Sequence, residues 1–142
     1  MRWLPQLLVP LVAIALLAAV PGWLRHRELT RALESQHYLA SLHMAQERYR
    51  LAHGRYAGDV QQLDLDRPAP TFFAIGQIVP GITGDLQTSW SLTLTRFGET
   101  FFYGDYTVTF NERGFDASRS SIDQAISPQR DPVATLAKYV VR

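Results

Sequence analysis

The stretch LLVPLVAIALLAAVPGWL, residues 7–24, decides the organisation of this 142-residue chain. No ionisable side chain occurs between Arg2 and Arg25, which leaves 22 consecutive uncharged residues. About 20 mostly apolar residues are needed for a helix to cross the hydrocarbon core of a bilayer. Trp3 and Trp23 flank the stretch, and amphipathic aromatic rings favour the headgroup region. The pattern predicts that residues 1–24 form a transmembrane helix.

Two other interpretations of this stretch remain open. A cleaved signal peptide would have a short basic region at Arg2, an apolar core, and the small residues Ala18 and Ala19 near the cleavage site. A buried core helix is the other alternative. The helical pattern continues beyond residue 24 without a break, and the apolar span is long for a signal peptide. Both features favour an anchor that is retained.

The same helix is predicted to continue over residues 25–53 as its soluble half. This range contains neither Pro nor Gly and is rich in good helix formers. One apolar stripe at spacings of three and four residues indicates a face that packs on a core: Tyr38, Leu42, Ala45, Tyr49 and Ala52. Leu29 and Leu33 extend an apolar face toward the membrane. Polar residues off the stripe are expected to be solvated or loosely packed: Glu34, Gln36, His37 and Gln46. Gly54 supplies the left-handed position that commonly ends a helix.

The chain after the helix changes to turn and strand patterns. Residues 54–85 are rich in Gly, Pro and Asp and predict a connecting loop. Apolar and polar residues alternate over 90–95 and 106–110, which predicts two half-buried strands of an antiparallel sheet. Residues 101–103 are expected to begin the second of these strands, and 115–118 to form a third. Residues 131–140 suit a short helix or a last strand, so 86–142 form the head. The fold class is α+β, one long helix packed on an antiparallel meander.

The charge distribution divides the chain at the same place. Residues 1–57 carry seven Arg and three Glu, a net charge of +4, whereas residues 58–142 carry a net charge of −3. The overall charge of +1 disfavours a nucleic-acid-binding domain, which usually has a strong basic excess. The chain contains no cysteine, which excludes disulfide scaffolds and thiolate zinc sites.

No pattern in the sequence indicates catalysis. The four histidines all fall on the predicted helix, at spacings that do not pair two metal ligands on one face: His26, His37, His43 and His53. Phosphate-binding and serine-nucleophile motifs are missing. Asp64 and Asp66 are interpreted as solvated loop charges. We therefore expect no enzyme activity, no cofactor, no metal and no small-molecule substrate.

Three segments of the chain resemble the type IV pilin and pseudopilin family. Residues 12–21, VAIALLAAVP, look like the apolar N-terminal pilin helix with a proline toward its end. Residues 45–63, AQERYRLAHGRYAGDVQQL, are similar to the segment where the pilin helix ends, and the turn Gly54-Arg55-Tyr56 is the strongest match. Residues 110–114, FNERG, look like a hairpin of the pilin sheet. The resemblance implies a pilin-like fold whose soluble domain lies outside the bacterial inner membrane.

The chain also departs from the family pattern. Pilin precursors carry a short basic leader and a glutamate shortly after it, but the nearest residue here is Gln6. The disulfide loop common in the family is missing. These departures predict an atypical, unprocessed relative, or a true start that lies upstream. Arg25, Arg27 and Arg31 follow the apolar span, and a literal positive-inside count would place the head in the cytoplasm. The topology implied by the resemblance opposes that count, and we favour it.

The resemblance implies a minor pilin or pseudopilin of a type IV pilus or type II secretion-type filament, which acts by helix–helix assembly. Its partners would be the membrane and other pilin-like subunits or assembly proteins, with incorporation into a surface fibre as an expectation. Small residues in the apolar helix permit close approach of helices in lipid. The candidate assembly residues are Leu7, Leu8, Val12, Ala13, Ile14, Ala15, Leu16, Leu17, Ala18 and Ala19. The alternatives are a non-polymerising accessory module of a pilus or secretion machine and a periplasmic binding protein released by signal cleavage.

Overall fold

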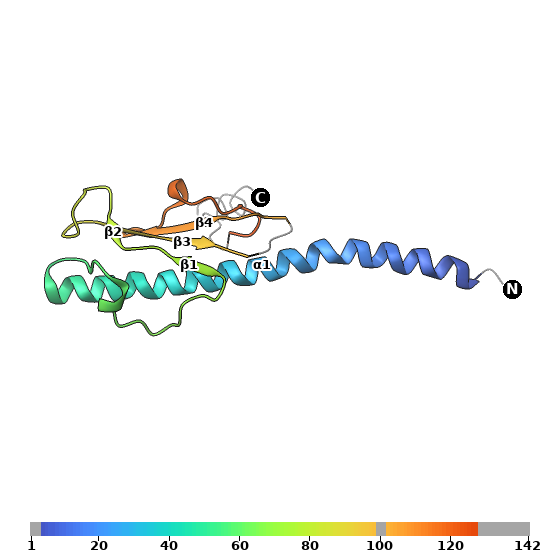
Figure 1. The fold of residues 1–142 in the computed structure, drawn as a ribbon, viewed down its shortest axis with the longest axis horizontal. Coiled ribbons are helices and arrows are strands. Elements are labelled where there is room, and N and C mark those ends of the chain that lie inside the picture. Colours follow the sequence, from blue (N-terminus) through green and yellow to red (C-terminus); the bar gives the residue numbers. More distant parts are fainter. Residues whose placement is uncertain (1–3, 99–101, 128–142) are drawn as a thin grey trace, which may run out of the picture.

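A computed structural model describes residues 4–98 and 102–127 of the chain. One α-helix, α1, spans Leu4–His53 and is 50 residues long. Its C-terminal half lies along a small sheet, and its N-terminal half extends beyond the head (Figure 1). The predicted combination of one long N-terminal helix and an antiparallel sheet is confirmed.

The end of α1 follows from the residues at its C-terminus. Gly54 has a φ of 73°, in the left-handed region that glycine adopts without strain. Its N–H donates to the Arg50 carbonyl at 2.8 Å, which satisfies one of the free carbonyls of the last turn. The predicted helix terminus is therefore confirmed. At the other end, Pro10 and Pro21 lie inside the continuous helix.

Every strand pairing among the described residues is antiparallel. The strands are β1 (Phe73–Ile75), β2 (Val79–Pro80), β3 (Trp90–Arg96), β4 (Thr107–Asn111) and β5 (Gly114–Phe115). Their order is β1-β3-β4-β5, and β2 also pairs with β3. Leu92 lies opposite Phe110 and Leu94 opposite Val108, so the apolar positions of the two longest strands share one face. Two short 3-10 helices, Val60–Gln62 and Ala117–Arg119, complete the head.

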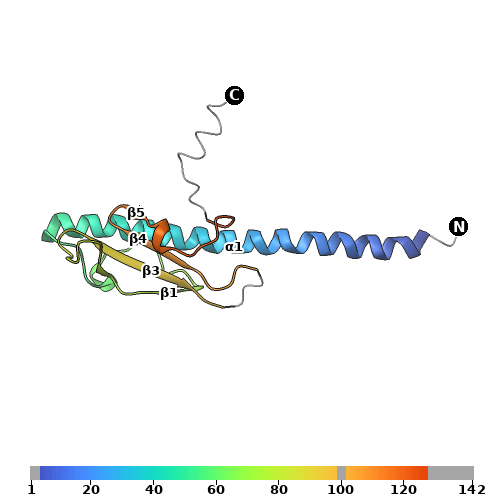
Figure 2. The same cartoon turned by 90° about the horizontal axis from the view of Figure 1, so that it is seen from above.

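The core lies between one face of α1 and this apolar face of the sheet. The helix contributes Tyr38, Leu39, Leu42 and Ala45, and the sheet contributes Trp90, Leu92, Leu94, Val108 and Phe110. Seen from above, the strands run beside the C-terminal half of the helix (Figure 2). Burial of an apolar side chain removes it from water and contributes about 1.5–3 kcal/mol. This contact therefore holds the head on the helix.

Part of the predicted stripe on the helix is wrong. Tyr38, Leu42 and Ala45 are buried and Tyr49 is half-buried, but Ala52 is exposed because the sheet ends before it. Leu29 is half-buried and Leu33 is exposed. Gln36 and Gln46, which we expected to be solvated or loosely packed, are buried, whereas Glu34 and His37 are exposed.

Strand boundaries in the head also differ from the predictions. Residues 54–85 contain β1 and β2, so this connection adds two strands to the sheet. Residues 102 and 103 form a turn, Gly104 follows with a φ of 58°, and β4 begins only at Thr107. The third strand ends at Phe115, because Asp116 caps the 3-10 helix that follows. Phe101 and the segment predicted over 131–140 lie outside the described residues.

Candidate assembly surface and its junction with the head

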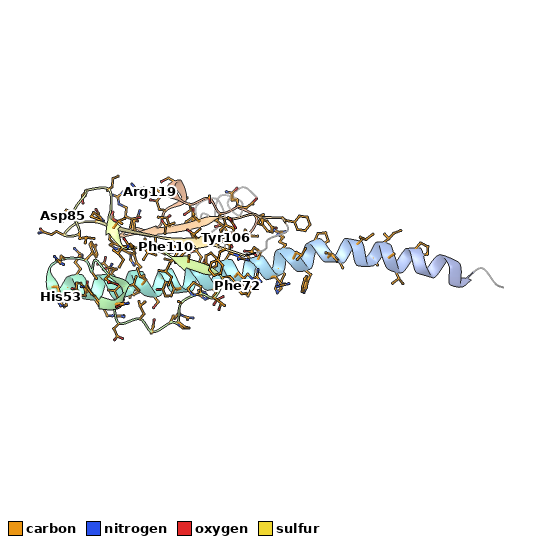
Figure 3. The ribbon with its side chains drawn as sticks, in the orientation of Figure 1. His53, Phe72, Asp85, Tyr106, Phe110 and Arg119 are labelled. Atoms are coloured by element: carbon orange, nitrogen blue, oxygen red, sulfur yellow. The ribbon has the colours of Figure 1, made fainter. Side chains whose placement is uncertain are left out.

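The N-terminal half of α1 presents apolar side chains that no other described element covers. Val12, Ile14, Leu17, Val20 and Trp23 are all among the exposed large hydrophobic residues, and Leu17 is 73% exposed. Figure 3 shows that side chains along the N-terminal half of α1 stand free of the head. Exposed apolar side chains that form a continuous surface mark a site of association with protein or lipid.

The predicted assembly residues all fall on this part of α1. Leu7, Leu8 and Leu16 lie in the helix, and seven further positions have exposed side chains: Val12, Ala13, Ile14, Ala15, Leu17, Ala18 and Ala19. Among the residues described with their side chains, no helix combines the length and the apolar character needed to cross a membrane.

The predicted turn Gly54-Arg55-Tyr56 joins the helix to the sheet. Arg55 is exposed and Tyr56 is buried. The Tyr56 N–H donates to the Leu86 carbonyl at 2.8 Å, and its hydroxyl donates to Glu47 Oε1 at 3.0 Å. The Arg50 guanidinium lies 5.4 Å from the centre of the Tyr56 ring. The tyrosine therefore ties the end of α1 to the segment before β3.

Gln46, which we expected to be solvated or loosely packed, makes two buried hydrogen bonds. Its side chain is fully buried, and its amide pairs with both backbone groups of Ala57. Gln46 Nε2 donates to the Ala57 carbonyl at 3.1 Å, and Gln46 Oε1 accepts from the Ala57 N–H at 2.8 Å. A buried backbone group without a partner is costly, so this amide satisfies the chain where it leaves the helix.

A buried ionic network joins α1 to the sheet where the protruding half of the helix begins. Glu28, on α1, accepts from Arg96 Nε at 2.8 Å and from Arg96 Nη2 at 3.2 Å. The Tyr106 hydroxyl donates to the same carboxylate at 2.8 Å, and Arg31 Nη1 lies 3.4 Å from it. The Arg96 side chain has no exposed surface, and it also donates to the carbonyl of Phe97. We call Glu28, Arg96 and Tyr106 the junction network.

The electrostatics of the junction network favour an ionised Glu28. Burial raises the pKa of Glu28, but the hydrogen bonds from Arg96 and Tyr106 and the charges of Arg96 and Arg31 together bring this pKa below its ordinary value. Burial, the hydrogen bond to Glu28 and the charge of that carboxylate raise the pKa of Tyr106 well above its ordinary value. The tyrosine is therefore a neutral hydrogen-bond donor to a charged carboxylate. A carboxylate with several charge-assisted donors fixes the position of one element on another.

The part of the chain that the structure describes contains no cluster of three or more potential metal ligands. His43 Nε2 lies 3.1 Å from the Glu112 carbonyl, and His53 stacks on Tyr49. Asp64 and Asp66 are exposed as expected, and Asp66 accepts from Ser41.

Compared with known proteins, the chain matches no family model, no curated protein and no solved structure.

Proposed function

We propose that the chain is a membrane-anchored, pilin-like structural subunit, a minor pilin or pseudopilin, whose N-terminal helix half packs beside other such helices. The observation that carries the proposal is the extension of α1 beyond its head with exposed apolar side chains. Residues 3–24 contain no ionisable side chain, and at 1.5 Å per residue they would span about 33 Å as a helix. This length is close to the roughly 30 Å hydrocarbon core of a bilayer.

The chemistry of assembly would be packing, with no covalent step. Side chains that face lipid gain little from the hydrophobic effect when helices associate, so close approach over small residues drives association. Ala13, Ala15, Ala18 and Ala19 supply such residues, and their side chains are exposed. In this proposal the head lies on the periplasmic side of a bacterial inner membrane, and the subunit can enter a surface fibre.

A second candidate function has one sequence observation in its favour. In the pilin family that the chain resembles, a glutamate near the start of the helix pairs with a neighbouring subunit's amino terminus, whereas the first acidic residue of this chain is Glu28. An intramembrane carboxylate is costly unless it is paired, and such a pair would specify subunit register in a filament. Its absence favours an accessory module of a pilus or secretion machine that does not polymerise.

Membrane extraction followed by mass spectrometry tests the anchor. The proposal predicts that the full chain stays in the membrane pellet after alkaline carbonate washing and that detergent releases it with residues 1–24 intact. Recovery of a chain cleaved near Ala18 or Ala19 in the soluble fraction would contradict the proposal. Detection of the protein in sheared surface fibres would reject the accessory module, and its exclusion from such fibres would reject the filament subunit.

A further inference from the structure

The exposed aromatic side chains of the described residues are one on α1 and three on the head, and they gather where the protruding half of the helix meets the head. Four residues, which we call the aromatic rim, are the large aromatic side chains exposed within residues 4–98 and 102–127: Trp23, Phe72, Phe97 and Phe102. The exposed large residues elsewhere on the head are aliphatic or Met, such as Ile82 and Leu51. Exposed aromatic rings are therefore separated from exposed aliphatic side chains on the surface of the molecule.

The three phenylalanines of the rim lie at the end of the head from which the protruding half of α1 extends. The Phe97 N–H donates to the Phe72 carbonyl at 3.1 Å, and both residues adjoin the junction network at Arg96. Phe102 lies between β3 and β4, and the described part of this connection is on the side of the head nearest the N-terminal helix half in both ribbon views (Figures 1 and 2). Phe72 and Tyr106 are also nearer to that half than His53 and Asp85 are (Figure 3).

Arginines accompany the aromatic rim. The Arg27 guanidinium lies 4.6 Å from the centre of the Trp23 ring, and the Arg31 guanidinium lies 3.9 Å from that of Phe72. Arg25 donates to the Ala125 carbonyl at 3.2 Å, which leaves further N–H groups available. Arg25 and Arg27 have no carboxylate partner within the described ranges, whereas Arg31 pairs with Glu28. The rim therefore combines exposed aromatic rings with two uncompensated positive charges.

This combination matches the interfacial region of an anionic bilayer. Aromatic rings are enriched at headgroup level, and basic side chains near the surface are attracted to anionic lipids. The apolar residues end at Leu24, and Arg25 and Arg27 follow directly. A helix that spans the bilayer up to residue 24 would place the aromatic rim at headgroup level.

We propose that the aromatic rim and Arg25 and Arg27 form a docking surface for anionic lipid headgroups of the bilayer that holds α1. The head would rest on the membrane, and its orientation would depend on lipid charge. This inference depends on the proposed membrane anchor. It adds a second lipid contact, made by the head, to the one made by the helix.

The test uses single-cysteine variants of the full chain, which has no cysteine of its own. A polarity-sensitive fluorophore is attached at Phe102→Cys, and the matched control is Ile82→Cys, an exposed apolar position in the loop between β2 and β3. Each labelled protein is reconstituted into phosphatidylcholine vesicles with and without phosphatidylglycerol, and brominated lipid serves as the quencher. Flotation of the vesicles reports insertion independently of the fluorophore.

The proposal predicts a blue shift and quenching by brominated lipid for the label at 102, both larger with phosphatidylglycerol, and neither for the label at 82. Replacement of both arginines, Arg25→Gln with Arg27→Gln, should remove the dependence on phosphatidylglycerol while flotation is retained. Flotation with equal, polar emission from both labels would overturn the lipid contact but leave the anchor intact. A blue shift that follows protein-to-lipid ratio instead of lipid charge would assign the rim to a second copy of the chain. Failure to float would overturn the anchor and the rim proposal with it.

Discussion

The junction network offers the most direct perturbation of how the head is held on the helix. The substitution Glu28→Gln keeps the size of the side chain and an oxygen that can accept from Tyr106, but removes the negative charge. The Arg96 guanidinium then stays buried, opposite a neutral amide and carbonyl groups. In the parent chain, the Glu28 carboxylate neutralises the Arg96 charge through two hydrogen bonds, at 2.8 and 3.2 Å.

Removal of one partner of a buried ion pair costs about 3–5 kcal/mol, because the other charge is left uncompensated. We expect a value of about 3 kcal/mol for Glu28→Gln, at the low end of this range, since the amide still accepts hydrogen bonds. A total stability of about 5–15 kcal/mol makes this a large fraction of the free energy of unfolding. In contrast, Arg113→Gln removes an exposed guanidinium that lies 3.8 Å from Glu112, and this change should cost about 0–1 kcal/mol.

The assay is urea unfolding of the head in the full chain, purified in mild detergent and followed by near-ultraviolet circular dichroism. The double variant Glu28→Gln with Arg96→Met should be less destabilised than the sum of the two single variants, because neither charge is then left alone. The reasoning is refuted if Glu28→Gln and Arg113→Gln lower the free energy of unfolding equally.

Three further predictions concern stability. The pKa of Glu28 in the folded chain lies below its ordinary value of about 4.3. The ionised carboxylate therefore stabilises the fold above that pH, and this stabilisation is lost as the pH falls through the lowered pKa. The melting temperature should consequently fall less on acidification in Glu28→Gln than in the parent chain. Gln46→Ala leaves the Ala57 N–H and carbonyl without these partners and should lower the free energy of unfolding by about 1–3 kcal/mol. The control Gln61→Ala, at an exposed position, should change it by close to zero in the same urea titration. Gly54→Val places a β-branched residue at a φ of 73° and should lower the free energy of unfolding by about 1–3 kcal/mol, more than Gly54→Asn does. Equal melting temperatures for these two variants would argue against the left-handed helix terminus.

Local patterns predicted the elements with strong periodicity. The stripe through Tyr38, Leu42 and Ala45 has helical spacing, and its burial follows from the sheet that covers it. The alternation through Leu92 and Leu94 predicted β3 almost to its ends. The short strands were missed or misplaced, because three residues such as Phe73–Ile75 form a strand only when a neighbour supplies its hydrogen bonds. The aromatic residues at 102 and 103 matched strand propensity, but the turn through Gly104 determined their conformation.

The polar contacts of the junction could not be predicted from local sequence. Glu28 and Arg96 are separated by 68 positions, and nothing near either residue distinguishes a buried charge from a solvated one. Glutamine is typical of exposed positions on a helix, and the burial of Gln46 depends on the path of the chain after Gly54. In both cases the tertiary fold brings a polar partner to a position that a hydrophobic pattern assigns to solvent.

The central proposal, that the N-terminal half of α1 associates with like helices in a membrane, is tested most directly by a cysteine cross-linking scan. Because the chain lacks cysteine, single substitutions at each position from 12 to 19 can be oxidised in native membranes without a background reaction. Assembly through this helix predicts cross-linked dimers that peak with a period of three to four residues on the face shared by Ala15, Ala18 and Ala19, and none at exposed Leu51 near the opposite end of the helix. Uniformly absent cross-links over positions 12–19, in protein that remains in the membrane pellet, would contradict assembly through this helix.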